Sequence, residues 1–137
     1  MLPTLSEIYF RNLYEVELSD NSTFIFSLQN FKPDSFFNRP FAIITAGNPN
    51  NIDLTLEENI KRNALLYSEL NSRNVLHAKG CYLDHCEDGY LIYDMSLKSA
   101  LSLGRKYEQV AIFYNDTNCL MYIDCKKESV ISEKKVA

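Results

Sequence analysis

The sequence predicts an α+β protein whose elements follow a ferredoxin-like, split βαβ order from residue 41. Three observations lead to this prediction. A continuous apolar run beginning at Phe41 is typical of a strand buried on both faces, two amphipathic segments carry helix N-caps, and polar turns separate the remaining strands. In this order both helices pack on one face of an antiparallel sheet. A short helix and a β-hairpin precede this part, and an extra C-terminal strand follows it.

The first 40 residues are expected to supply a helix, a hairpin and a loop. Thr4-x-x-Glu7 is a capping box, which predicts the start of a helix. The loop carries Phe31, Phe36 and Phe37 and is expected to fold over the core as a lid. The expected elements are a helix over 5–13, strands over 14–18 and 23–28, and an irregular loop over 29–40.

The ferredoxin-like part begins with the apolar strand. Its expected elements are a strand over 41–47, a helix over 56–71, strands over 75–83 and 89–93 around a turn at 84–88, a helix to 107, and strands over 110–114 and 120–124. Thr55-x-x-Glu58 is a capping box for the first helix, and Ser96 caps the second. Gly104 lies on the apolar face of the second helix. Since a mid-helix glycine costs about 1 kcal/mol relative to alanine, close packing is expected there.

Length and composition predict one domain over 1–125 and a flexible, lysine-rich tail over 126–137. The chain has 137 residues, is 46% hydrophobic and 23% charged, and carries a net charge of −4. This negative charge argues against general nucleic-acid binding, because phosphate contacts need a basic surface. No apolar run approaches the roughly 20 residues that span a bilayer, so no membrane partner is predicted. The N-terminus lacks the pattern of a signal peptide, so a cytoplasmic location is expected.

The cysteines are predicted to be reduced thiols, and no metal or other cofactor is expected. His77, Cys81, His85 and Cys86 fall within ten residues. None of these pairs has the C-x2-C spacing of common structural zinc sites, and part of the cluster falls in an expected strand. A chain without a secretory signal more often keeps its thiols reduced. The four cysteines are Cys81, Cys86, Cys119 and Cys125.

The loop after the apolar strand is the strongest candidate for a functional site. Residues 47–51 read Gly-Asn-Pro-Asn-Asn, and a polar loop at the end of a buried strand is a common place for ligand-binding groups. Asn59 and Asn63 lie one turn apart inside the apolar arc of the following helix. An unpaired buried amide costs about 1–3 kcal/mol, so Asn48 and the loop backbone are expected partners. Two explanations stay open: the amides hold the loop to the helix, or they line a pocket.

Two arginines could complete such a pocket. Arg62 follows Glu58 at i,i+4 spacing, which is usually a surface ion pair, but it could instead lean over the loop. Arg105 lies beside the apolar face of the second helix, where it could hold an anion or cap the helix C-terminus. The predicted ligand-binding residues are Thr45, Asn48, Asn59, Arg62, Arg105 and Gln109.

These motifs resemble the domain of unknown function 3293, an uncharacterised and largely bacterial family. The resemblance covers roughly residues 9–124. The family's Thr-Ala-Trp-Asn-Pro, Glu-Asn-x-x-Arg and Leu-Gly-Arg patterns have counterparts in order, although Gly47 stands at the position of the tryptophan. The resemblance implies no established activity. The corresponding residues are Thr45, Ala46, Asn48, Pro49, Glu58, Asn59, Arg62, Leu103, Gly104, Arg105 and Gln109.

Three functions are therefore considered. The first is recognition of a small anionic or nucleotide-like ligand in a polar pocket at the end of the strand over 41–47. The second is a protein-interaction module, an inhibitor or regulatory subunit, which the aromatic segment over 31–37 and the edge strands suggest. The third is a hydrolase-type enzyme with Glu58 as general base and the arginines as anion clamps. No nucleophile or phosphate-loop motif is present, so no catalytic residue is predicted beyond that candidate.

Overall fold

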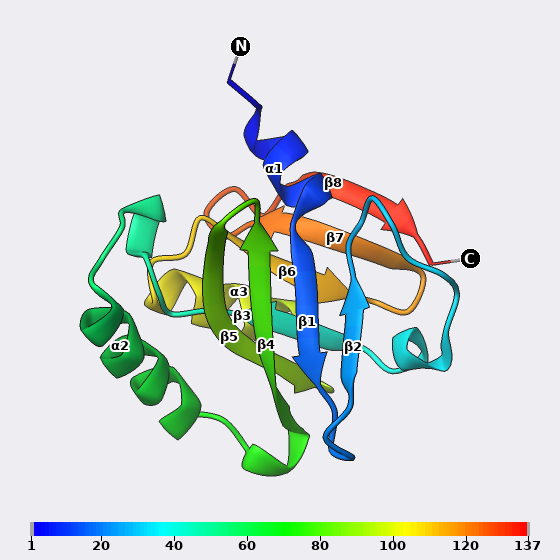
Figure 1. Ribbon diagram of the computed structural model, residues 1–137, viewed down its shortest axis with the longest axis horizontal. Helices are drawn as coiled ribbons and strands as arrows, with labels where there is room; N and C mark the ends of the chain where they lie inside the picture. Colours follow the sequence, from blue (N-terminus) through cyan, green and yellow to red (C-terminus); the bar gives the residue numbers. More distant parts are fainter. Residues whose placement is uncertain (1, 137) are drawn as a thin grey trace.

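The computed structural model describes residues 2–136, apart from the side chain of residue 73, and shows one curled antiparallel sheet. Its eight strands lie in the order β2-β1-β4-β5-β3-β6-β7-β8 (Figure 1). The strands are β1 (Leu13–Glu17), β2 (Thr23–Phe26), β3 (Phe41–Ile44), β4 (Val75–Tyr82), β5 (His85–Tyr93), β6 (Ala111–Asn115), β7 (Cys119–Asp124) and β8 (Val130–Lys135). The helices are α1 (Leu5–Arg11), α2 (Leu56–Ser68) and α3 (Leu97–Lys106), with short 3-10 turns η1 (Ser35–Asn38), η2 (Pro49–Asn51) and η3 (Ser72–Asn74).

The predicted ferredoxin-like fold is wrong, although most of the predicted helices and strands are present. The N-terminal hairpin pairs with β4 through β1, and β8 extends the other edge, so the sheet is wider than a split βαβ unit. The eight strands curl into a half-barrel with a concave and a convex face (Figure 1). A ferredoxin-like sheet has helices on one face only, whereas here both faces carry a core.

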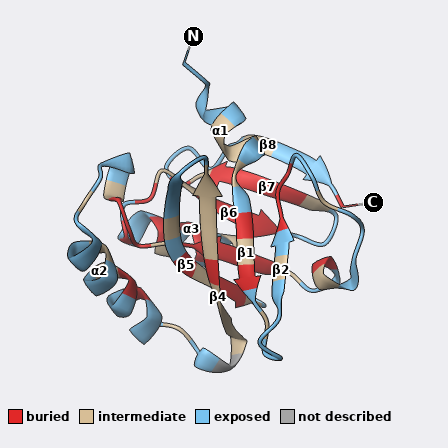
Figure 2. Cartoon of the chain, viewed as in Figure 1, coloured by how far each residue is buried: buried red, intermediate tan, exposed pale blue. Residues whose placement is uncertain are grey.

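Alternate residues of the central strand β3 supply these two cores. Phe41 and Ile43 belong to the aromatic core on the concave side, and Ala42 and Ile44 belong to the core on the helix side. All four residues of β3 are buried, which confirms that this strand is covered on both faces. Figure 2 shows the buried residues concentrated in the central strands, whereas α2 is largely exposed.

The convex core is tightly packed against α3. A Cβ atom added to Gly104 would lie 2.7 Å from the sulfur of Cys125 and 2.8 Å from Cγ2 of Ile112. This confirms the close packing predicted for Gly104. Burial raises the pKa of the Cys125 thiol to about 11, so this cysteine stays protonated at neutral pH.

The loop before β3 closes one end of the concave face, as predicted for the aromatic lid. Phe37 in η1 is fully buried, and the ring of Phe36 stacks on that of Phe24 with centroids 4.2 Å apart. Phe31 of the same loop lies against β8, where Lys134 Nζ is 5.4 Å from its ring centroid. The aromatic segment is therefore part of the core and is not a free docking surface.

Two local predictions differ from the structure. The tail expected to be flexible contains β8, which pairs with β7 as an edge strand. The hairpin turn lies at Leu83 and Asp84, so β5 begins at His85, four residues earlier than expected. Pairing with β4 overrides the polar composition of residues 85–88 because the ladder supplies backbone hydrogen bonds to this segment.

The expectation that all cysteines are reduced thiols is also wrong. Cys81 and Cys86 face each other across the β4–β5 pair and form a disulfide, with Cα atoms 4.1 Å apart. Directly opposed residues in an antiparallel pair lie close enough for such a bond. Cys119 and Cys125 are free.

Candidate functional site

The strand-end loop is built from asparagines whose backbone is left-handed. The φ angles of Asn48, Asn50 and Asn51 are 46°, 54° and 59°. Asparagine tolerates this conformation better than other residues with a side chain, because its short amide can bond locally. The run of asparagines is therefore required first by the backbone path of the loop.

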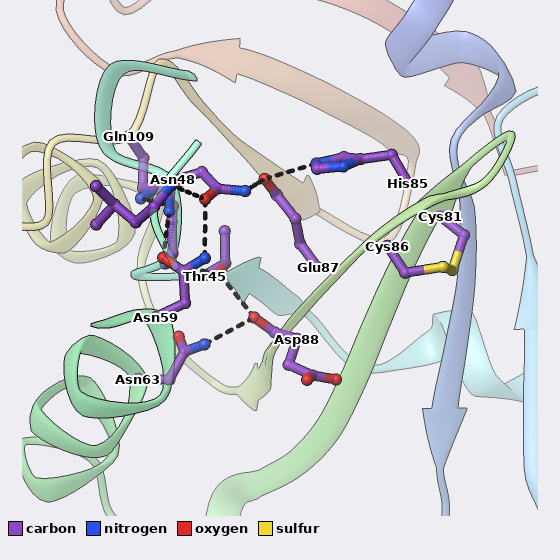
Figure 3. Close-up of polar contacts among 12 residues, drawn as sticks. Thr45, Asn48, Asn59, Asn63, Cys81, His85, Cys86, Glu87, Asp88 and Gln109 are labelled. Atoms are coloured by element: carbon purple, nitrogen blue, oxygen red, sulfur yellow. Dashed lines mark hydrogen bonds and ion pairs between the residues drawn. A yellow bond between two sulfur atoms is a disulfide. The ribbon is translucent and has the colours of Figure 1, made fainter. Parts of the chain in front are cut away.

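The amides of α2 hold this loop in place (Figure 3). Asn59 accepts a bond from the Asn48 backbone N–H at 2.9 Å and donates to the Asn48 side-chain oxygen at 2.8 Å. Asn63 accepts from the Ala46 N–H at 2.9 Å and donates to the Asp88 carbonyl at 3.0 Å. The predicted pairing is confirmed for Asn59, whereas Asn63 bonds to Ala46, just before the loop, and to Asp88 of β5. Both amides are satisfied without a ligand.

The two arginines also bond to the protein backbone. Arg62 donates to the carbonyls of Ala46 and Tyr107 at 2.6 and 2.7 Å. Arg105 donates to the carbonyl of Cys125 at 2.8 Å and lies 3.9 Å from Glu128. Neither guanidinium lines the cavity described below.

Glu58 and Gln109 have different surroundings. Glu58 completes the predicted capping box of α2, where Oε1 accepts from the Thr55 hydroxyl at 2.9 Å, and it does not line the cavity. Gln109 is buried, donates to the carbonyls of Gly47 and Tyr107, and lines the cavity.

A cavity of about 440 Å³ lies on the concave face of the sheet. Its floor is the aromatic core of the curled sheet, including Tyr14, Phe113 and Tyr122. Helix α1 covers one side of it, and Tyr9 of this helix stacks on Tyr122 with ring centroids 4.5 Å apart. Cavities of this size hold small organic ligands.

The hydroxyls of Tyr9, Tyr14 and Tyr122 in the cavity remain protonated over a wide pH range. Burial raises the pKa of Tyr9 to about 12. The pKa of Tyr14 is raised well above its ordinary value by burial and by the neighbouring Tyr122, and burial likewise raises that of Tyr122. The Tyr122 hydroxyl also accepts a bond from Asn12 Nδ2 at 3.0 Å. The floor thus presents neutral hydroxyl groups between aromatic rings.

The polar wall of the cavity comes from the strand-end loop and the β4–β5 hairpin (Figure 3). Asn48 Nδ2 donates to Glu87 Oε1 at 2.8 Å, and His85 Nε2 lies 3.5 Å from the same oxygen. Asp53 adds a second carboxylate. Among the lining residues described, none is lysine or arginine, so the wall has an acidic character.

The structure therefore separates the predicted site residues into two groups. Thr45, Asn48 and Gln109 line the cavity, whereas Asn59, Arg62 and Arg105 do not. Reasoning from the sequence missed the lining residues Tyr9, Asn12, Tyr14, Tyr82, His85, Glu87 and Tyr122. The spacing of His85, Glu87 and Gly89 could have indicated part of this lining, because every second residue of a strand lies on the same face.

The histidines and cysteines of the 77–86 segment do not converge. His77 Nε2 lies 3.2 Å from Asp88, His85 lies beside Glu87, and the cysteines between them are bonded to each other. Within residues 2–136, no group of three histidine, cysteine or acidic side chains is arranged to hold a metal ion. The same residues include no helix long and apolar enough to cross a bilayer.

The fold and the cavity define a small protein in which a curled antiparallel sheet and a capping helix enclose a pocket. The family model described as "Protein of unknown function (DUF3293)" matches residues 44–112, which is half of the chain. The chain belongs to this family. The match includes the strand-end loop, α2, the β4–β5 hairpin and α3, whereas α1, β1 and β7 lie outside it. No curated protein and no solved structure matches the chain.

Proposed function

We propose that the protein binds a small aromatic molecule, neutral or positively charged, in the cavity on the concave face. The observation that carries the proposal is the aromatic cavity of about 440 Å³ with the Glu87 carboxylate, fixed by Asn48, at its wall. Aromatic rings on the floor favour a flat ligand, and a carboxylate favours a ligand with a donor or a positive charge.

The proposal revises the expected charge of the ligand. Arg62 and Arg105 were expected to neutralise an anion, but their guanidinium groups bond to backbone carbonyls. An anionic ligand in the cavity would instead face Glu87 and Asp53. A nucleoside without its phosphate remains compatible with this wall, because carboxylates and amides can bond to its hydroxyl and amino groups.

The first experiment compares matched probes by thermal shift and calorimetry. Tryptamine and adenosine are expected to stabilise the protein, whereas indole-3-propionate and adenosine monophosphate are expected to have less effect. Equal stabilisation by the anionic and the other probes would contradict the proposed charge preference. Absence of stabilisation by all four probes would contradict the proposed function.

Variants then test whether binding occurs in this cavity. Ala78 is buried and lines the cavity, so Ala78→Leu should occupy part of it and weaken binding, whereas Ala64→Leu on the exposed side of α2 is the matched control. Glu87→Gln keeps an acceptor for Asn48 and removes the charge, so tryptamine affinity should fall about tenfold while that of adenosine changes little. Glu57→Gln, whose side chain is 81% exposed, is the control for this change. Unchanged binding in Ala78→Leu would place the ligand elsewhere.

A further inference from the structure

The disulfide lies between two residue pairs that form part of the wall of the cavity. In the β4–β5 register, Gly80 is opposite Glu87, Cys81 is opposite Cys86, and Tyr82 is opposite His85. The outer two pairs line the cavity, and alternation of side chains puts the Cys81–Cys86 pair on the opposite face. The disulfide therefore fixes the distance between the two strands at the position where they present these residues to a ligand.

The end of this hairpin has few other supports. β3 pairs with β5 only from Tyr90 to Tyr93, so residues 85–89 have β4 as their single strand partner. On the other side, β1 reaches β4 only as far as Cys81. Thr45 and Asn63 both donate to the Asp88 carbonyl, which fixes the hairpin at that residue. Beyond it, the bond from Asn48 to Glu87 is the contact with the loop.

The turn itself is unfavourable for its sequence. Leu83 has a φ of 53° and is 84% exposed. A bulky side chain rarely adopts this conformation, and glycine or asparagine is preferred at such turn positions. The turn therefore does little to keep the strands paired when the disulfide is open.

We propose that Cys81–Cys86 is a reversible redox site that controls this part of the cavity wall. In the oxidised form the disulfide holds Tyr82, His85 and Glu87 in the positions seen here. In the reduced form the strands separate at residues 82–87, and the ligand loses this wall. The effect on ligand binding rests on the proposed function, whereas the effect on the hairpin does not.

The reaction requires a dithiol as reductant. Its thiolate attacks the sulfur of Cys86, which belongs to the more exposed of the two residues, and forms a mixed disulfide while Cys81 leaves as a thiolate. The second thiol of the reductant then displaces Cys86. The protein gains two electrons and two protons, and the reductant is oxidised to its own disulfide.

Hydrogen exchange measured by mass spectrometry tests the effect on the hairpin. The intact protein is compared before and after treatment with dithiothreitol, with complete reduction verified by the gain of two hydrogens in mass. Amides of residues 82–87 should exchange at least ten times faster after reduction, while those of β6 and β7 should not change. Unchanged exchange at 82–87, or a disulfide that is reduced only in denaturant, would overturn the proposal.

Matched variants assign the effect to this cysteine pair. The double variant Cys81→Ser, Cys86→Ser should show the fast exchange of the reduced form and no response to dithiothreitol. Cys119→Ser removes a free cysteine and should respond as the wild type does. A double variant that exchanges as slowly as the oxidised protein would contradict the proposed role of the disulfide.

Tryptamine binding tests the control of the cavity. Affinity should fall at least fivefold on reduction of the wild type and should not depend on dithiothreitol in the double variant. If tryptamine binds both forms equally while the hairpin opens, the control of binding is overturned. If tryptamine binds neither form, the proposed function fails, and the exchange rates alone still decide whether the disulfide holds the hairpin.

Discussion

The strand-end loop and the concave cavity are neighbours that share Asn48, but they use their polar groups differently. In the loop, Asn59, Asn63 and Arg62 bond to backbone groups close to them. In the cavity, Glu87, His85 and Tyr122 line the wall and floor of a pocket large enough for a small ligand. The comparison shows that a cluster of polar residues in one sequence motif can be structural, while residues from separate strands form the site able to accept a ligand.

The largest expected effect concerns the structural role of the loop. Asn63→Ala leaves the buried Ala46 N–H without its acceptor and removes one of the two donors to the Asp88 carbonyl, and should lower the free energy of unfolding by about 3 kcal/mol. Urea unfolding measures this change. Lys61→Ala on the exposed side of the same helix should change stability by less than about 0.5 kcal/mol. A small effect of Asn63→Ala would mean that this amide is free to bind a ligand.

A pH titration tests the buried phenols of the cavity. Because the pKa of Tyr9 is raised to about 12 in the folded protein, the unfolded chain releases this proton first, near pH 10. The raised pKa of Tyr9 therefore adds to the free energy of unfolding an amount on the order of 2 kcal/mol. This stabilisation is complete below about pH 10 and is lost as the pH rises to about 12.

Urea unfolding at several alkaline pH values, with tyrosinate absorbance as a second signal, measures this loss. Tyr9→Phe should lose less stability over the same interval. An identical pH dependence in Tyr9→Phe and the wild type would show that this hydroxyl is not buried as described.

Added side-chain volume should cost more stability on the helix side of the sheet than on its concave side. Gly104→Ala forces a Cβ atom against Cys125 and Ile112, which should cost about 1–2 kcal/mol even though alanine favours helix. Ala78→Leu extends into the cavity and should change stability by less than about 1 kcal/mol. Thermal unfolding of both variants measures the difference. A larger cost for Ala78→Leu would indicate that the concave side has no room for a ligand.

The smallest expected effect separates backbone from side-chain roles in the loop. Asn50 is exposed and left-handed, so Asn50→Ala should cost about 1 kcal/mol, whereas Asn50→Gly should be nearly neutral. The midpoint of urea unfolding is sufficient to measure both. If the two substitutions cost the same, the side chain of Asn50 and not its backbone conformation would matter.

Much of the local structure could be predicted because its causes are local. Thr55 and Glu58 form the capping box expected from their spacing, and the apolar run at Phe41 is a strand buried on both faces. The pairing of Asn59 with Asn48 in the loop was also predictable, since a helix that follows a strand packs beside it.

The disulfide and the acidic wall were not predicted because they depend on strand register. Placing the turn at 84–88 separated Cys81 from Cys86 and left Glu87 in a loop. The true turn at Leu83 and Asp84 puts the cysteines opposite each other and directs Glu87 into the cavity. A shift in hairpin register changes which residues face each other, and only pairing with neighbouring strands fixes that register.

The sequence by itself determined where most of the helices and strands lie, how the helices begin, and that Asn59 holds the strand-end loop. These features depend on residues close together in the chain or on one element packing against its neighbour. Only the tertiary structure decided that the sheet curls, that α1 covers its concave face, and that Tyr9, Glu87 and Tyr122 meet around one cavity. The stacked rings of Tyr9 and Tyr122 are 113 positions apart in the chain, and such contacts form only when distant strands pair in this order.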